Sequence, residues 1–166
     1  MNQEKIKDLE KTINSDYSNI AGIVVQKNGT KLYEHYFNEC TATSRIHVYS
    51  VTKSIISILI GIAMDKGYIK DINHGMWNGK QIVSKGWIDE STKEHSRWEK
   101  LNLPYGYLWW VGNDKERGYA AMGDGGNIIY VNTKKKMVVS IASLFVPKVK
   151  DRIKFIKEYI EPIFED

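Results

Sequence analysis

Several features that define common protein classes are missing from this 166-residue chain. A single cysteine, Cys40, excludes an internal disulfide and a cysteine-cluster metal site. The histidines show no ligand spacing of the His-x-x-x-His kind: His35, His47, His74 and His95. No internal repeat or low-complexity segment is present. We therefore expect one domain over residues 1–166, with no metal site and no cofactor.

Long apolar runs are also scarce. The longest, residues 55–64, has ten residues, too few to cross a bilayer, and Lys53, Asp65 and Lys66 flank it. Residues 1–5 are mostly polar and contain no apolar core of the signal-peptide kind. We therefore expect no membrane span and, unless an export signal has been removed, a cytoplasmic chain.

Charge of one sign is not concentrated along the sequence. Lysine and arginine number 24 against 20 acidic residues, which gives a net charge of +4. The only tight basic run, residues 134–136, lies between two strand-like segments and is predicted to be a lysine-rich hairpin turn. A nucleic-acid partner is therefore not expected.

Helical and strand patterns alternate in the first half. Ile6, Leu9 and Ile13 recur at helical spacing, which predicts an amphipathic N-terminal helix. Residues 21–27 and 30–37 read as two strands joined at Asn28-Gly29. These two residues tolerate the positive φ that a tight hairpin turn requires.

Two further helices follow the hairpin. After a loop, the apolar run predicts a buried helix from about Ser50 to Lys66, which Gly67 stops. Residues 70–76 show no clear pattern and are predicted as a loop. A short helix with a Ser84 cap comes next, and then a polar stretch through residue 100.

The last third is rich in strand patterns. The segments are residues 107–111, 118–122, 127–131 and 137–144, and their short connections imply antiparallel pairing. A helix from about residue 148 closes the chain. The pattern predicts an α+β fold: an antiparallel β-sheet flanked by helices, with the terminal helices on one face and the Ser50 helix on the other.

The tetrad Ser50-Val51-Thr52-Lys53 has the clearest chemical content. In a helix, Ser50 stands at the N-terminus and Lys53 lies one turn later on the same face. A serine hydroxyl needs a base to become a nucleophile, and a lysine is such a base when its surroundings depress its pKa. A Ser-x-x-Lys arises about once by chance in a chain of this composition, so a serine-capped helix start is the alternative.

Neighbouring segments strengthen the catalytic interpretation. Residues 48–57 resemble the active-site helix of the penicillin-binding protein and class C β-lactamase-like serine hydrolases. The resemblance continues in the family's order through residues 65–69, 77–84, 105–110 and 121–127. It implies the β-lactamase/transpeptidase-like fold.

The resemblance also implies roles for particular residues. Ser50 would form an acyl-enzyme with Lys53 as the base, and Lys53 is expected to lie neutral in a partly buried site. The backbone N–H groups of Ser50 and Asp124 would form an oxyanion hole. Substrate-binding positions are implied for Gly123, Asp124, Gly125 and Gly126, although a bulge or turn is the alternative for the glycines. The substrate would be a small acyl compound or a β-lactam.

This chain departs from the family pattern in two ways. Separately, the family's members are often exported. Family members are typically longer, with a helical second domain whose Tyr-x-Asn motif takes part in proton transfer. Here the interval near residues 70–76 resembles the scar of an internal deletion, natural or engineered, and the motif is absent. The family's Lys-Thr-Gly or His-Thr-Gly aligns with Ala121-Met122-Gly123, which keeps only the glycine.

Two functional hypotheses follow. One is a serine hydrolase or acyl transferase, impaired by the missing tyrosine. The other is a non-catalytic remnant of the fold that serves as a self-associating or binding module. Loss of the second domain is expected to expose apolar surface around residues 55–64, and with it to favour a homodimer.

The site hypothesis makes geometric predictions. We expect the side chains of Ser50 and Lys53 within hydrogen-bond reach on a mostly buried helix, with residues 118–122 alongside. Asp124 is a possible ion-pair partner of Lys53, and His47 is expected to be structural. Four aromatic side chains near residue 108 are expected to alternate, one of each pair facing the core and the other solvent or a cleft: Tyr105, Tyr107, Trp109 and Trp110. Core and sheet-face packing is favoured for them over lining a pocket.

Overall fold

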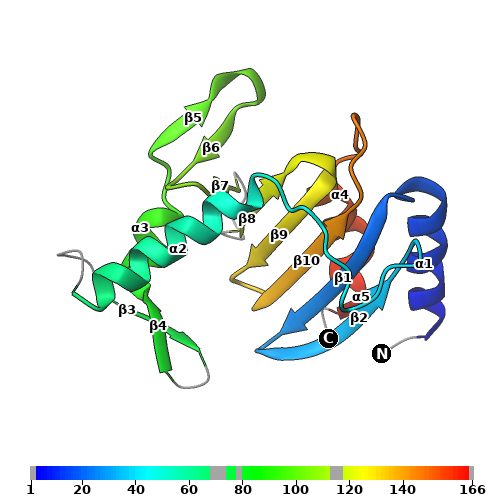
Figure 1. Ribbon diagram of the computed structural model, residues 1–166, viewed down its shortest axis with the longest axis horizontal. Coiled ribbons are helices and arrows are strands. Elements are labelled where there is room, and N and C mark those ends of the chain that lie inside the picture. The colour runs from blue at the N-terminus through cyan, green and yellow to red at the C-terminus, as the bar shows by residue number, and fades with distance from the viewer. Residues whose placement is uncertain (1–2, 68–73, 78–79, 113–117, 165–166) are drawn as a thin grey trace.

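A computed structural model describes residues 3–67, 74–77, 80–112 and 118–164. Eight strands form one antiparallel sheet in the order β2-β1-β10-β9-β8-β7-β6-β5 (Figure 1). The strands are β1 (Ile20–Lys27), β2 (Thr30–Tyr36), β5 (Ser96–Trp98), β6 (Leu103–Tyr105), β7 (Trp110–Val111), β8 (Gly118–Gly123), β9 (Asn127–Asn132) and β10 (Met137–Ser143). The predicted α+β class with an antiparallel sheet is therefore confirmed.

Strands from the two ends of the chain pair with each other in the sheet. β1 lies between β2 and β10, so the N-terminal hairpin pairs with the last strand. Asn28 and Gly29 turn the hairpin with φ of 50° and 75°, as their sequence predicted.

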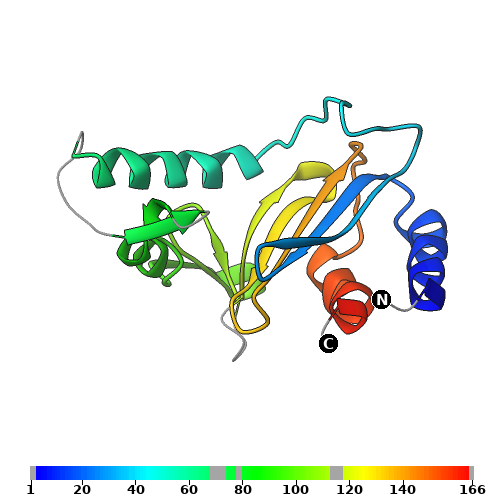
Figure 2. The same cartoon turned by 90° about the horizontal axis from the view of Figure 1, so that it is seen from below.

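The terminal helices cover one face of the sheet. They are α1 (Gln3–Asp16) and a C-terminal helical segment made of α4 (Arg152–Phe155), the π-helical η3 (Ile156–Ile160) and α5 (Glu161–Phe164). Figure 2 shows both on the side of the sheet opposite the long helix α2. Their fully buried side chains include Leu9, Ile13, Phe155, Ile156 and Ile160, and each such burial contributes about 1.5–3 kcal/mol.

The C-terminal helix begins later than its sequence suggested. Asp151 is its N-cap, and its carboxylate accepts hydrogen bonds from the N–H groups of Ile153 and Lys154 at 2.8 and 3.0 Å. A cap of this kind satisfies backbone donors at the helix start, which explains why helical structure begins at Arg152.

Helix α2 (Val51–Asp65) lies on the other face of the sheet, but the prediction that it is mostly buried is wrong. Its buried positions are the small or short residues Val51, Ser54, Ser57 and Gly61. Four of the larger side chains are exposed: Ile55, Ile56, Leu59 and Ile60. A run that is apolar all round does not reveal which of its faces is covered.

Helix α3 (Lys85–Ser91) and a two-stranded sheet of β3 (His74–Trp77) and β4 (Lys80–Ser84) lie near the C-terminal end of α2 (Figure 2). The Ser84 hydroxyl accepts a hydrogen bond from Trp87 N at 2.9 Å, which confirms the predicted cap. The loop expected over residues 70–76 is wrong for residues 74–76, which belong to β3. The possible deletion near residues 70–76 falls largely outside the described residues and stays a prediction.

Two corrections concern the segment before β8. The polar stretch through residue 100 contains a hairpin, in which η1 (Glu99–Leu101) joins β5 to β6. The strand expected over residues 107–111 is limited to Trp110–Val111, because Leu108 takes a left-handed φ of 67° and turns the chain. β5 and β6 have three residues each, too few to show a period, so the sequence did not reveal them.

Candidate active site

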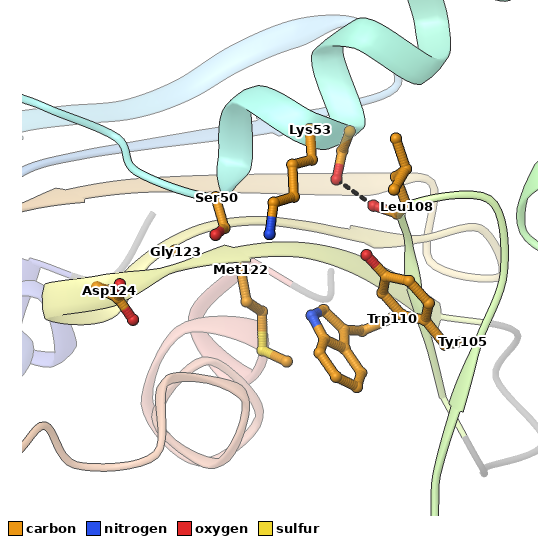
Figure 3. A pocket seen from close by; sticks show the side chains of 9 residues that line it. Ser50, Lys53, Tyr105, Leu108, Trp110, Met122, Gly123 and Asp124 are labelled. Carbon is orange, nitrogen blue, oxygen red and sulfur yellow. Dashed lines mark hydrogen bonds between the residues drawn. The ribbon is translucent and has the colours of Figure 1, made fainter. Parts of the chain in front are cut away.

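A cavity of ≈ 270 Å³ lies at the N-terminal end of α2. Figure 3 shows Ser50 and Lys53 on its α2 side, with Trp110 and Met122 opposite them. The full lining is Ser50, Lys53, Ser54, Tyr105, Leu108, Trp110, Met122, Gly123 and Asp124. The structure thus brings together four of the residues that the sequence singled out, Ser50, Lys53, Gly123 and Asp124.

Ser50 is the N-cap residue of α2, but its hydroxyl makes no capping hydrogen bond. Its backbone is already helical, with φ −68° and ψ −9°. The preceding Tyr49 has a φ of 48°, a left-handed conformation that costs a residue of this kind about 1–3 kcal/mol. This turn presents the Ser50 side chain to the cavity without engaging it in the helix cap.

His47 supports the turn before Ser50. Its Nδ1 accepts a hydrogen bond from Tyr49 N at 3.1 Å, and its ring lies 4.3 Å from the Tyr49 ring. The Tyr49 ring in turn contacts Phe145, with the centroids 5.6 Å apart. His47 does not line the cavity, which agrees with the structural role expected for it.

Lys53 lies one turn after Ser50, and its Nζ points into the same cavity (Figure 3). The lysine is exposed, so the expectation of a partly buried base is wrong for this conformation. Among the described residues, no hydrogen bond joins Lys53 Nζ to Ser50 Oγ, and no ion pair joins Lys53 to Asp124. Lys53 therefore has no carboxylate partner within the described chain.

The end of β8 packs directly against the start of α2. A Cβ added at Gly123 would lie 2.3 Å from Val48 O and 3.2 Å from Ser50 N. Only glycine permits this approach. The prediction that the strand of residues 118–122 lies beside Ser50 is confirmed.

The turn after Gly123, η2 (Asp124–Gly126), places its residues in two directions. Asp124 lines the cavity, whereas Gly125 and Gly126 do not. The two glycines are buried with φ of 77° and 85°. Gly125 O accepts a hydrogen bond from Asn19 at 2.7 Å, and Gly126 packs against the Arg152 guanidinium. These contacts favour the turn-forming role for Gly125 and Gly126 over contact with a substrate.

Asn127 is a residue of the site that the sequence did not single out. Its buried side-chain amide donates to Asp124 O at 2.7 Å and to His47 O at 3.4 Å. Its Oδ1 accepts from Ser143 N at 3.0 Å. Asn127 therefore ties the turn that carries Asp124 to the segment that precedes Ser50. In the sequence, Asn127 ends the family-like segment 121–127 and starts an apolar strand, but neither feature assigns it this role.

Two of the four aromatic residues line the cavity, which was the less favoured of the roles expected for them. Tyr105 and Trp110 contact each other at 4.6 Å between ring centroids, and both face the site (Figure 3). Trp109 points the other way and is buried against Val51 and Ala121, as alternation along a strand requires. Burial raises the pKa of the Tyr105 phenol, which therefore stays protonated at neutral pH.

The described residues contain no group of three or more His, Cys, Asp or Glu side chains arranged to hold a metal ion. In the same part of the chain, no helix combines the length and apolar character needed to span a membrane.

Comparison with known proteins identifies the fold. No family model matches the sequence, and no curated protein sequence matches it. A structure titled as a 6-aminohexanoate-dimer hydrolase from Bacillus anthracis aligns with a TM-score of 0.72 at 12% identity, over 93% of this chain and 81% of that one. A β-lactamase from Mycobacterium bovis aligns with a TM-score of 0.60 at 11% identity, over 82% of this chain and 91% of that one. The chain therefore has the β-lactamase/transpeptidase-like fold.

Proposed function

We propose that the protein is a serine hydrolase of the Ser-x-x-Lys type, related to the penicillin-binding proteins and class C β-lactamases, in which Ser50 forms an acyl-enzyme. The observation that carries the proposal is the convergence of Ser50, Lys53 and the Gly123–Asp124 backbone on one cavity. The Ser50 hydroxyl is not used as a helix cap, and a hydroxyl without that structural task is available for chemistry.

The reaction consists of two acyl transfers. Ser50 Oγ attacks the substrate carbonyl carbon while neutral Lys53 accepts the hydroxyl proton. The carbonyl oxygen becomes an oxyanion between the N–H groups of Ser50 and Asp124, where each donor is worth about 3 kcal/mol. The bond to the leaving group breaks, and the proton passes from Lys53 or water to that group. Water then attacks the acyl-Ser50 ester, releases the acid and restores the Ser50 hydroxyl.

Turnover is expected to be slow. The Tyr-x-Asn motif of the longer relatives is expected between α2 and β4, and the sequence has none in that interval. Lys53 is also exposed to water. Losing one member of a coupled catalytic set commonly costs several orders of magnitude in rate. An acyl-enzyme that forms faster than it hydrolyses is therefore the expected behaviour.

Rapid-mixing kinetics with p-nitrophenyl acetate test the proposal. A burst of p-nitrophenol close to one equivalent per chain, followed by a slow steady state, is expected. Ser50→Ala removes the burst and Lys53→Met slows it. Thr52→Ala is the matched control, because Thr52 is exposed in the same turn of α2 and does not line the cavity. A burst of equal size in Ser50→Ala rules out Ser50 as the nucleophile.

The second candidate function is a self-associating or binding module without turnover. The observation that favours it is the exposed apolar outer face of α2, made of Ile55, Ile56, Leu59 and Ile60. Unpartnered surfaces of this kind mark association sites in many proteins. The absence of any Ser50-dependent burst, together with self-association, supports this alternative.

A further inference from the structure

Two turns project from the same side of the molecule in Figure 1. The first, here called the hairpin tip (residues 98–103), contains η1, which joins β5 to β6. The second, here called the loop tip (residues 144–151), connects β10 to α4. In the same view the N-terminal end of α2 lies between the two tips, and the β1–β2 turn is on the opposite side of the molecule.

Both tips carry large apolar side chains that are exposed to solvent. Phe145 is exposed by 57% and Leu101 by 56%, and among the large apolar side chains of the described residues only Leu59 is comparably exposed. Trp98 is also exposed at the hairpin tip, and Leu144 and Val149 at the loop tip. Exposed apolar groups that gather in this way mark interaction sites.

One aromatic contact connects each tip to the surroundings of Ser50. Trp98 packs on Trp110, with the ring centroids 5.8 Å apart, and Trp110 lines the Ser50 cavity. Phe145 packs on Tyr49, the residue before Ser50, with the centroids 5.6 Å apart. A partner that contacts both tips therefore extends across the region of Ser50.

The charged side chains make the loop tip the more cationic of the two. At the hairpin tip, the exposed side chains of Glu99 and Lys100 carry opposite charges. At the loop tip, Lys150 is held in an ion pair and Asp151 caps α4. Lys148 is exposed and has no ion-pair partner within the described part of the chain. Its ammonium group is therefore available to a negatively charged partner.

Two separate apolar protrusions suit a lipid surface better than a folded partner. A protein would need two pockets at the matching spacing, whereas the headgroup region of a bilayer deforms around each protruding side chain. Tryptophan, phenylalanine and leucine with a lysine nearby are residues that hold proteins at the boundary between headgroups and acyl chains.

We propose that the protein docks on an anionic lipid surface through the hairpin tip and the loop tip, with the N-terminal end of α2 between the two contacts. The docked chain lies on the bilayer and does not span it. The proposal is independent of the serine-hydrolase function, because neither tip contains a residue of the proposed catalytic machinery.

Co-sedimentation of the full chain with lipid vesicles tests the proposal. Vesicles of phosphatidylcholine alone are compared with vesicles that contain phosphatidylcholine and phosphatidylglycerol in equal amounts. We expect the protein to bind the mixed vesicles more tightly. Phe145→Glu and Leu101→Glu should each lower the partition coefficient at least about tenfold, because each removes a buried apolar anchor. Lys148→Ala should lower binding to the mixed vesicles about fivefold and leave binding to phosphatidylcholine unchanged.

Leu32→Glu is the matched control, because Leu32 is an exposed leucine of β2, outside both tips, and its substitution should leave vesicle binding unchanged. Quenching of tryptophan fluorescence by brominated phosphatidylcholine gives a second readout. If Trp98 enters the bilayer, Trp98→Phe binds normally but loses most of the quenching.

Failure of the proposal is distinguishable at each step. No binding to either kind of vesicle overturns it, and so does binding that is unchanged in both Phe145→Glu and Leu101→Glu. An equal loss in Leu32→Glu overturns the assignment to the two tips. Tip variants that change the sedimentation coefficient of the lipid-free chain, in the absence of vesicle binding, show that the tips contact a second copy and not a lipid surface.

Discussion

Ser50 is held in place by its neighbours and not by its own side chain. Tyr49 takes the left-handed turn, Gly123 allows β8 to reach the start of α2, and Asn127 joins the two backbone segments. An oxyanion hole depends on donors that are fixed before the reaction begins. Substitutions at these positions are therefore expected to affect acylation more than they affect the fold.

Gly123→Ala tests the close approach of β8. The added methyl group would lie 2.3 Å from Val48 O, so the start of α2 or the end of β8 must shift. We expect acylation of Ser50 to slow at least about tenfold, because small displacements of catalytic groups are costly. Gly118→Ala on the same strand is the control, since its nearest contact is 3.3 Å from the Tyr130 phenol oxygen. Wild-type acylation in Gly123→Ala would contradict the packing described.

Asn127→Ala tests the link between the two segments. It leaves the Asp124 and His47 carbonyl groups without their amide donor, at a cost of about 1–3 kcal/mol in the free energy of unfolding. Asn132 is the matched control, because it is a buried asparagine at the other end of β9 that donates to Glu161 at 2.9 Å. Both alanine variants should lose stability in urea titrations, but only Asn127→Ala should lose about tenfold in acylation rate. Equal acylation rates in the two variants would remove the positioning role.

At the scale of single residues, the sequence predicted the members of the site that belong to a motif. Ser50 and Lys53 were predicted from their helical spacing, and Gly123 was predicted from the glycine cluster that contains it. Trp110 and Met122 were not predicted as cavity residues, because strand alternation separates two faces but does not say which face meets a cavity. Lys53 was expected to be partly buried but is exposed. The burial of a side chain depends on segments that are distant in the sequence, and the local pattern around Lys53 carries no information about them.

At the scale of elements, a glycine without a side chain, Gly61, allows α3 to pack closely against α2. A Cβ at Gly61 would lie 2.5 Å from Trp87 Cδ1, so the Trp87 ring of α3 packs directly on the helix backbone. The contact explains a glycine inside a helix, where it ordinarily costs about 1 kcal/mol relative to alanine.

In Gly61→Ala, helix propensity and packing act on the free energy of unfolding in opposite directions. Propensity alone would stabilise the protein, but displacing a buried tryptophan costs about 1–3 kcal/mol, so a net loss of stability is expected. Urea unfolding followed by tryptophan fluorescence measures the change. In a Trp87→Leu background the same substitution should be less harmful, because the ring is gone. A stabilised Gly61→Ala protein would show that Trp87 does not pack on Gly61.

Elements with a strong local signal were predicted well. The hairpin of β1 and β2 has its Asn-Gly turn, and α3 has its Ser84 cap. β5 and β6 were missed because three residues show no period. The depth of α2 was misjudged because its apolar residues surround the whole helix, and the sequence pattern alone does not choose between a covered and an open face.

At the scale of the whole molecule, buried tyrosines make stability sensitive to alkaline pH. Burial raises the pKa of Tyr33 and of Tyr119, and Glu10 adds to the effect at Tyr33. A phenol whose pKa is higher in the folded state stabilises the fold below about pH 10, and that contribution is lost as the unfolded chain ionises at higher pH. We expect the free energy of unfolding to fall above about pH 10 by up to about 1.4 kcal/mol per pH unit for each such phenol.

Tyr33→Phe checks this expectation. The variant lacks the hydrogen bond from the phenol to Glu10 at 3.2 Å, so it should be slightly less stable at pH 8. Its stability should nevertheless fall less steeply with pH, because one ionisable phenol is gone. Chemical denaturation at a series of pH values measures both slopes. Identical slopes in the two proteins would contradict the assigned burial of Tyr33.

The outer face of α2 raises the question of association. Four apolar side chains of this face are well exposed: Ile55 by 42%, Ile56 by 47%, Leu59 by 56% and Ile60 by 39%. The sequence analysis expected exposed apolar surface here, because the second domain of the longer relatives would cover this helix. We predict that the chain self-associates through this face and that Leu59→Glu returns it to a monomer. Val149→Glu is the control, because Val149 is also exposed but lies outside α2. Sedimentation velocity measures both; a wild-type monomer at high concentration contradicts the prediction.

The central claim is that Ser50 can be acylated, and intact-protein mass spectrometry tests it most directly. The protein is mixed with p-nitrophenyl acetate or a reactive β-lactam, quenched in acid and mapped by peptide. We predict one adduct per chain on the peptide that contains Ser50, absent from Ser50→Ala and present in Thr52→Ala. The adduct should persist for longer than the mixing time, because the proposed function expects the acyl-enzyme to form faster than it hydrolyses. Labelling that is confined to other residues, or that is unchanged in Ser50→Ala, would contradict the account.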